Sequence, residues 1–66
     1  MYAWQVLERG EWNIIGAYLG TGLTPLVTTR KHVYDKMRSI AVVHADETGL
    51  PVRGVRYGEP DFIEDV

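Results

Sequence analysis

Hydrophobic and polar residues alternate along two stretches near the start of the chain, residues 2–8 and residues 12–19. A period of two, with aromatic and β-branched side chains, predicts β-strands. Between the two stretches, Gly10 readily adopts the positive φ angle that a short hairpin loop needs. The pattern therefore predicts a β-hairpin with strands at about 2–8 and 12–19.

The spacing of the apolar residues becomes helical over residues 29–48. The residues expected on the buried face of this helix are Val33, Met37, Ile40, Ala41 and His44. Thr28 or Thr29 is the expected N-cap, because a threonine hydroxyl can accept a hydrogen bond from a free amide of the first turn. Gly49 and Pro51 predict the end of the helix, since glycine suits the left-handed conformation there and proline cannot continue a helix.

Alternation resumes over residues 52–57 and predicts a third strand. The glycines and the proline of residues 20–25 predict an irregular connection between the hairpin and the helix. An order of strand, strand, helix, strand is typical of a two-layer α+β domain in which the helix covers one face of the sheet. We therefore predict one α+β domain over residues 1–58, followed by an acidic tail over residues 59–66.

The size of the chain limits how stable it can be alone. A chain of 66 residues holds one domain, and a domain of this size buries only about 60% of the surface that its unfolded chain exposes. The sequence has no cysteine, which excludes disulfides and thiolate metal sites. No apolar run reaches the roughly 18 residues of a membrane span, and the first residues do not resemble a signal peptide. We expect tight packing or a partner chain, no cofactor, no membrane contact and a cytoplasmic location.

The charges are unevenly distributed. Residues 1–58 carry all seven Lys and Arg residues and five of the nine acidic ones, whereas residues 59–66 carry four acidic residues. Phe62 and Ile63 lie among these acids, as in a short peptide that fills an apolar pocket while its carboxylates face a basic rim. Three roles stay open for the tail: docking on another protein, shielding the basic surface of its own domain or of a second copy, and a final short strand or frayed end.

Residues able to carry catalysis are few. Ser39, the only serine, is not in a Gly-x-Ser-x-Gly elbow, and it shares the predicted helix with His32 and His44. His44 has acidic neighbours but no second histidine four residues away, as a helical metal site would need. The glycines of residues 16–22 lack the Gly-Lys-Ser/Thr ending of a phosphate-binding loop. We therefore predict that the protein is not an enzyme.

Basic residues on two elements indicate an alternative function, nucleic-acid binding. The candidates are Arg30, Lys31, Lys36 and Arg38 on the helix and Arg53 and Arg56 on the last strand. Such residues neutralise phosphates, and Tyr34 and Tyr57 lie near them in the sequence to add aromatic support. The chain as a whole has a net charge of −2, which makes this function the less favoured one.

Large apolar side chains on both sides of the predicted strands favour a protein-binding face. The helix can cover only one side of the sheet, so the other side is left for a partner or for a second copy of the chain. The candidate residues on the strands and in the tail are Trp4, Trp12, Tyr18, Phe62 and Ile63.

The first residues also carry a family resemblance. The residues concerned are Met1, Tyr2, Trp4, Val6, the turn Gly10-Glu11-Trp12 and the segment 15–18. Over residues 1–18 the chain resembles short uncharacterised phage-encoded accessory proteins with a strand-strand-helix-strand layout. The resemblance implies a host or phage protein as the partner and no assigned activity.

The favoured function is therefore a small non-enzymatic interaction module that binds another protein or itself. Two alternatives remain: a small nucleic-acid-binding protein, and a minor structural component of a particle that is held in place by its neighbours.

Overall fold

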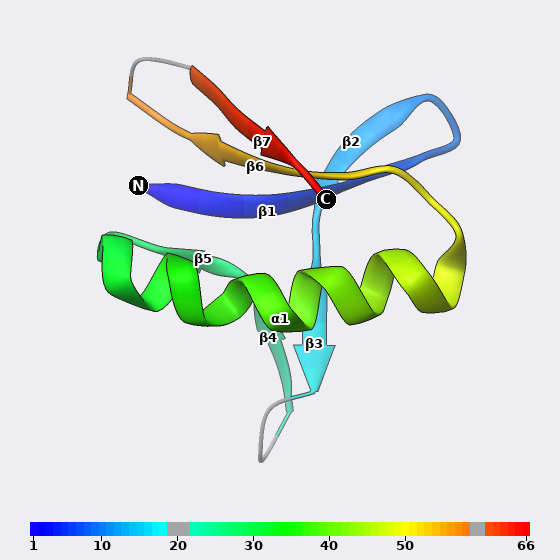
Figure 1. Ribbon diagram of the computed structural model, residues 1–66, viewed down its shortest axis with the longest axis horizontal. Helices are drawn as coiled ribbons and strands as arrows, with labels where there is room; N and C mark the ends of the chain where they lie inside the picture. Colours follow the sequence, from blue (N-terminus) through cyan, green and yellow to red (C-terminus); the bar gives the residue numbers. More distant parts are fainter. Residues whose placement is uncertain (19–21, 59–60) are drawn as a thin grey trace.

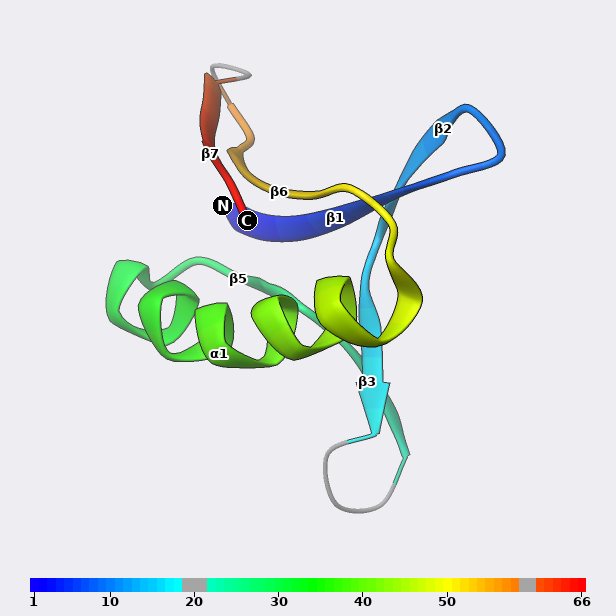
Figure 2. The same cartoon turned by 45° about the vertical axis from the view of Figure 1, so that its right-hand side comes forward.

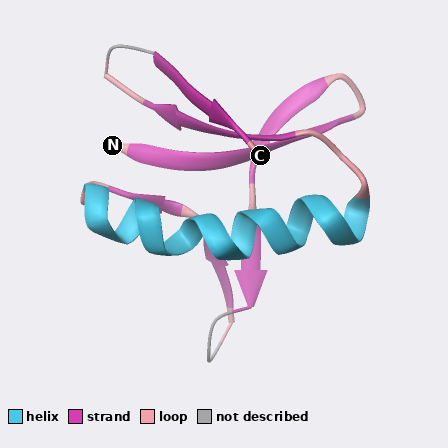
Figure 3. Ribbon diagram, in the orientation of Figure 1, coloured by secondary structure: helices cyan, strands magenta, loops and turns pink. Residues whose placement is uncertain are grey.

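The computed structural model describes residues 1–18, 22–58 and 61–66, with the side chains of all of these except Tyr18, Asp61 and Phe62. Within these residues the chain forms one helix and seven strands (Figures 1 and 3). In chain order they are β1 (Tyr2–Glu8), β2 (Glu11–Ile14), β3 (Gly16–Tyr18), β4 (Leu23–Pro25), β5 (Val27–Thr28), α1 (Lys31–Thr48), β6 (Val52–Arg56) and β7 (Asp61–Asp65). The predicted α+β fold is confirmed, with more strands than the sequence predicted.

β1 is the centre of the larger sheet. Along one edge it pairs with β6, and β7 pairs with the far side of β6. The other edge is shared, because β5 pairs with residues 2–3 and β2 with residues 5–8. All of these pairings are antiparallel, and α1 runs along one face of the sheet (Figures 1 and 2).

The chain leaves the larger sheet at Ile15 and returns to it at Leu26. The Ile15 amide donates to the Trp4 carbonyl at 2.9 Å, the Leu26 amide to the Ile15 carbonyl at 2.8 Å, and the Trp4 amide to the Leu26 carbonyl at 3.0 Å. These three hydrogen bonds hold Ile15 and Leu26 beside Trp4, where the side chains of both residues are buried. Between these two residues, β3 and β4 pair as a separate two-stranded sheet that extends away from β1 (Figure 1).

Two predictions for this region are wrong. A single strand over residues 12–19 does not form, because Ile15 turns into the core and divides it into β2 and β3. The stretch at 20–25 expected to be an irregular connection contains β4, and β5 follows it before the helix. The local pattern does not specify these pairings: β3 and β4 pair with each other apart from the larger sheet, and β5 pairs with β1 far away in the sequence.

α1 begins later than predicted and ends where predicted. Its N-cap is Arg30, which makes no capping side-chain hydrogen bond. The Thr28 hydroxyl accepts a hydrogen bond from the Arg30 amide at 3.1 Å, ahead of the helix, so the prediction of Thr28 or Thr29 as the N-cap is wrong. Gly49 is left-handed with a φ of 69°, and its amide donates to the Ala45 carbonyl, as predicted for the C-terminus.

The last predicted strand and part of the tail form one hairpin. The strand predicted at 52–57 is β6, and residues 61–65 of the tail form β7 beside it (Figure 1). The pairing skips Ile63, which leaves a bulge in β7. Of the three roles open to the tail, the described part forms a final strand, and its Glu64 also pairs with Arg38 of the domain's own basic surface.

The core lies between α1 and the larger sheet. Its buried members are Trp4, Val6, Ile15, Leu26, Tyr34, Met37, Ala41 and Val52. Met37 and Ala41 are buried as predicted, whereas His44 stays partly exposed. Tyr34, expected beside a basic patch, is 0% exposed. Because the Tyr34 ring stacks on Trp4, α1 is rotated so that Tyr34 lies on its buried face.

Tyr34 reaches this position by crossing β6 above Gly54. A Cβ atom at Gly54 would overlap the Tyr34 hydroxyl and would lie 2.8 Å from the Tyr34 Cζ and 3.1 Å from the Trp4 Cζ3. Gly54 is also the cross-strand partner of Trp4. The missing side chain at this position is therefore what lets Tyr34 lie flat on Trp4.

Substituting Gly54→Ala should lower the free energy of unfolding by about 3 kcal/mol, because the new methyl group displaces the Tyr34 ring. The matched control is Gly22→Ala, where an added Cβ meets nothing within 4 Å; its effect should stay below about 0.5 kcal/mol. Urea denaturation followed by tryptophan fluorescence measures both variants. Equal stability of the two would contradict the role given to Gly54.

Candidate protein-binding face

The two faces of the larger sheet carry different side chains. Cross-strand partners share a face and successive residues alternate between faces, so Trp4 points toward α1 and Gln5 points away from it. We call the side away from α1 the outer face. It is formed by Ala3, Gln5, Leu7, Trp12, Ile14, Arg53, Val55, Tyr57 and Asp65.

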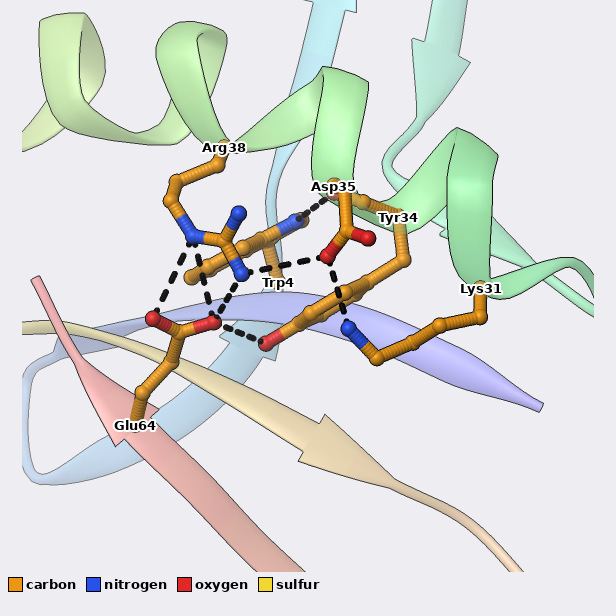
Figure 4. Close-up of polar contacts among 6 residues, drawn as sticks. All are labelled: Trp4, Lys31, Tyr34, Asp35, Arg38 and Glu64. Carbon is orange, nitrogen blue, oxygen red and sulfur yellow. Dashed lines mark hydrogen bonds and ion pairs between the residues drawn. The ribbon is translucent and has the colours of Figure 1, made fainter.

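On the side that faces α1, Tyr34 links the helix to the strands (Figure 4). Its ring stacks on the Trp4 ring with centroids 4.5 Å apart and planes inclined by 3°. The Trp4 indole N–H donates to the Tyr34 carbonyl at 3.2 Å, and the Tyr34 hydroxyl donates to Glu64 Oε1 at 3.0 Å. Arg38 Nε donates to both Glu64 oxygens at 3.2 Å. The four side chains tie α1 to β1 and β7.

The charges in this network stabilise one another. The Arg38 guanidinium holds the pKa of the Glu64 carboxyl below its ordinary value against the effect of burial, and the Tyr34 hydroxyl adds to the lowering. Lys31, 2.7 Å from Asp35, likewise lowers the Asp35 pKa. Burial first, and then the hydrogen bond to Glu64, raise the Tyr34 pKa, so this hydroxyl stays a donor. These paired groups indicate a structural tie rather than a reactive site.

On the outer face, the polar side chains are centred on Arg53. Its guanidinium carbon lies 3.9 Å from the centroid of the Trp12 ring, and its Nε donates to Gln5 Oε1 at 3.0 Å. Gln5 Nε2 donates to the Tyr57 hydroxyl. Gln5 is only 7% exposed, so its two hydrogen bonds satisfy an amide that would otherwise be costly to bury. Arg53 is therefore held from two directions.

Apolar surface surrounds this cluster. Ile14 is 41% exposed and Tyr57 is 39% exposed, while Leu7 and Trp12 are partly buried. Trp12 pairs with Leu7, and Ile14 with Gln5, across the ladder between β1 and β2, so these side chains share the outer face. The outer face thus presents apolar and aromatic side chains around one fixed cation.

The structure separates the residues that were predicted to bind protein. Trp4 is 0% exposed beneath α1, so the expectation that Trp4 and Trp12 share one binding face is corrected. The reason is the strand register, which puts the two on opposite faces. Ile63 packs against the core. The side chains of Tyr18, in β3, and Phe62, in β7, lie outside the described ones.

The six basic residues considered for nucleic-acid binding do not share one surface. Arg53 lies on the outer face, on the opposite side of the sheet from α1. Lys31 and Arg38 are engaged by acidic side chains on the helix side. The remaining three are exposed on or next to α1 and at the end of β6: Arg30, Lys36 and Arg56.

Sequence reasoning missed Gln5 as a member of a site, and it considered Tyr57 only as aromatic support for nucleic-acid binding. Alternation along each strand places Gln5 on the face opposite Trp4 and Tyr57 on the same face as Arg53. The strand order and register that bring Gln5 beside Arg53 were not available from this local pattern. The one usable signal was a polar residue in the middle of an otherwise apolar strand.

Within residues 1–18, 22–58 and 61–66, no group of three or more His, Asp or Glu side chains is arranged to hold a metal ion. In the same part of the chain, no helix has both the length and the apolar character that crossing a membrane requires.

Replacing Glu64 should weaken the fold in a manner that depends on pH. The folded protein lowers the Glu64 pKa below 4.5, so the charged carboxylate adds stability above that pH and the contribution is lost as the pH falls through the lowered pKa. Glu64→Gln should therefore be less stable than the parent at pH 7, and the gap should close on acidification. Urea denaturation at several pH values tests this, with exposed Glu47→Gln controlling for the loss of one negative charge. A gap that is constant down to strongly acidic pH would contradict the network.

Comparisons with protein-family models, with curated proteins and with solved structures give no match. The function of this protein must therefore be inferred from its own residues and their geometry.

Proposed function

We propose that this protein is a small non-enzymatic interaction module that binds another protein, or a second copy of itself, through the outer face of its sheet. The observation that carries the proposal is the placement of Trp12. This ring lies over Arg53 on the side of the sheet away from α1, the same face that carries the exposed side chains of Ile14 and Tyr57.

The residue types on this face suit protein recognition. Trp, Tyr and Arg are the residues that most often dominate the binding energy of protein interfaces. Here Trp12 and Arg53 hold each other, and Tyr57 is tied to Gln5. A partner would therefore meet side chains that are already ordered, which reduces the entropy lost on binding.

The small size of the chain gives the same face a second purpose. With 66 residues and no cysteine, the chain gains stability if a partner covers its remaining apolar surface. The resemblance of residues 1–18 to phage-encoded accessory proteins favours a host or phage protein as that partner. A structural component of a particle would use this face in the same way, with neighbouring subunits as the partners.

Nucleic-acid binding has less support. The six candidate cations are divided between the two sides of the sheet, and acidic side chains already engage Lys31 and Arg38. A phosphate backbone needs several cations along one surface.

Truncating Trp12→Ala should weaken binding at least about 30-fold, as expected for a central aromatic residue of an interface. The matched control is Val43→Ala, which also shortens an apolar side chain but lies on α1 and is 54% exposed. Sedimentation equilibrium measures self-association. For a different partner, affinity capture identifies it and titration with the purified partner gives the dissociation constant.

The tail is unsuitable for deletion as a test of binding, because β7 supplies Glu64 and Ile63 to the folded domain. Fluorescence of the buried Trp4 reports whether the Trp12 variant stays folded. If the folded Trp12 variant binds as tightly as the parent, or if Val43→Ala weakens binding equally, the outer face is not the binding surface.

A further inference from the structure

We infer that the outer face recognises a carboxylate, carried by an aspartate or glutamate within an otherwise apolar, extended segment of the partner protein, and that Arg53 binds it. This inference rests on the proposed function, because it names the chemistry that the partner must present to the same face.

Arg53 is held in a way that leaves part of its guanidinium available. Its Nε donates to Gln5 Oε1 at 3.0 Å, and its guanidinium carbon lies 3.9 Å from the centroid of the Trp12 ring. Among the described residues, neither Nη nitrogen has a hydrogen-bond acceptor. A planar guanidinium with its Nη groups free matches the two oxygens of a carboxylate.

The residue that positions Arg53 is Gln5, which is buried and forms hydrogen bonds through both ends of its amide. Gln5 is 7% exposed, its carbonyl oxygen accepts from Arg53, and its amide nitrogen donates to Tyr57. A buried amide with both ends engaged has one orientation, so it fixes the direction of the Arg53 Nε–H bond. The guanidinium therefore meets a ligand without first losing the freedom of a mobile surface arginine.

The nearest acidic residue on this face does not neutralise the charge of Arg53. Asp65 is the cross-strand partner of Arg53 in β7 and shares its face. Within the described part of the chain, however, the two do not form an ion pair. By contrast, Glu64, the next residue, is fully engaged on the helix side by Arg38 and Tyr34. The fold thus uses one tail carboxylate to close the network on the helix side and leaves Arg53 for an external one.

The surroundings of Arg53 favour an isolated carboxylate over a polyanion. Apart from Gln5 and Asp65, the side chains that share this face with it are apolar or aromatic, among them Trp12, Val55 and the exposed Tyr57. Asp65 adds a negative charge beside it, and the whole chain is net −2. A chain of phosphates would meet one cation and this repulsion, whereas one carboxylate between apolar side chains would meet charge and apolar surface together.

The test uses the full chain, labelled with ¹⁵N, and two capped pentapeptides with a central glutamate or a central glutamine between leucines. The Trp12 indole N–H and the Arg53 Nε–H signals are followed by NMR. The glutamate peptide should shift both signals and bind at least about tenfold more tightly than the glutamine peptide, because it adds charge-assisted hydrogen bonds.

Variants of the protein separate charge from geometry. Arg53→Gln should remove the preference for the glutamate peptide, and Arg53→Lys should retain only part of it, because an ammonium group lacks the planar fork. Asp65→Asn should strengthen binding of the glutamate peptide a few-fold by removing a like charge. Lys36→Gln, an exposed position on α1, controls for the loss of one positive charge and should keep the preference.

Several results would overturn the inference. One is equal affinity for the two peptides, and another is the absence of shifts at millimolar concentration. A third is a single-stranded oligonucleotide that moves the same two signals and binds more tightly than the glutamate peptide. If the glutamate preference is absent while Trp12→Ala still abolishes association with the purified partner, the proposed function stands and the carboxylate inference fails. If Trp12→Ala has no effect either, both fail.

Discussion

The position of Tyr34 depends on a residue that has no side chain. The Tyr34 side chain reaches from a tryptophan on one strand to a glutamate two strands away, and only a glycine on the strand between them leaves room for it. Trp4, Gly54 and Glu64 are in register on the helix-facing side of β1, β6 and β7. Tyr34 stacks on the first, lies over the second and donates to the third. One aromatic side chain therefore fixes the rotation of α1, its distance from the sheet and the position of the last strand.

This arrangement gives the two sides of the sheet different characters. On the helix side, Arg38 and Glu64 compensate each other's charge, so one acidic residue of the tail helps to hold the fold. On the outer face, Arg53 is held by an aromatic ring and a neutral amide, and neither cancels its charge. The inference that the outer face binds a partner depends on this contrast more than on the amount of apolar surface.

The features that could be predicted from the sequence are those whose cause lies within a few residues. The end of α1 at Gly49, the strand at residues 2–8 and the strand that became β6 all have local signals. The burial of Tyr34 has no such signal, because its space is created by a glycine on another element. Similarly, Gln5 and Arg53 are separated by 48 positions, and only the register between β1 and β6 brings them together. For the candidate site, the sequence indicated Trp12 and the presence of a second sheet face opposite the helix, but not the members that surround Arg53.

The hydrogen bond between Ile15 and Leu26 has an evolutionary consequence. It joins the two points at which the chain leaves and re-enters the larger sheet, and both side chains are anchored in the core. The segment between them contains the β3–β4 hairpin, and its two ends are fixed by residues outside that hairpin. Ala17 of β3 still packs against the core, but apart from this residue the hairpin can change in length and composition without disturbing β1, so it is where the protein gains new surface at little cost to its stability.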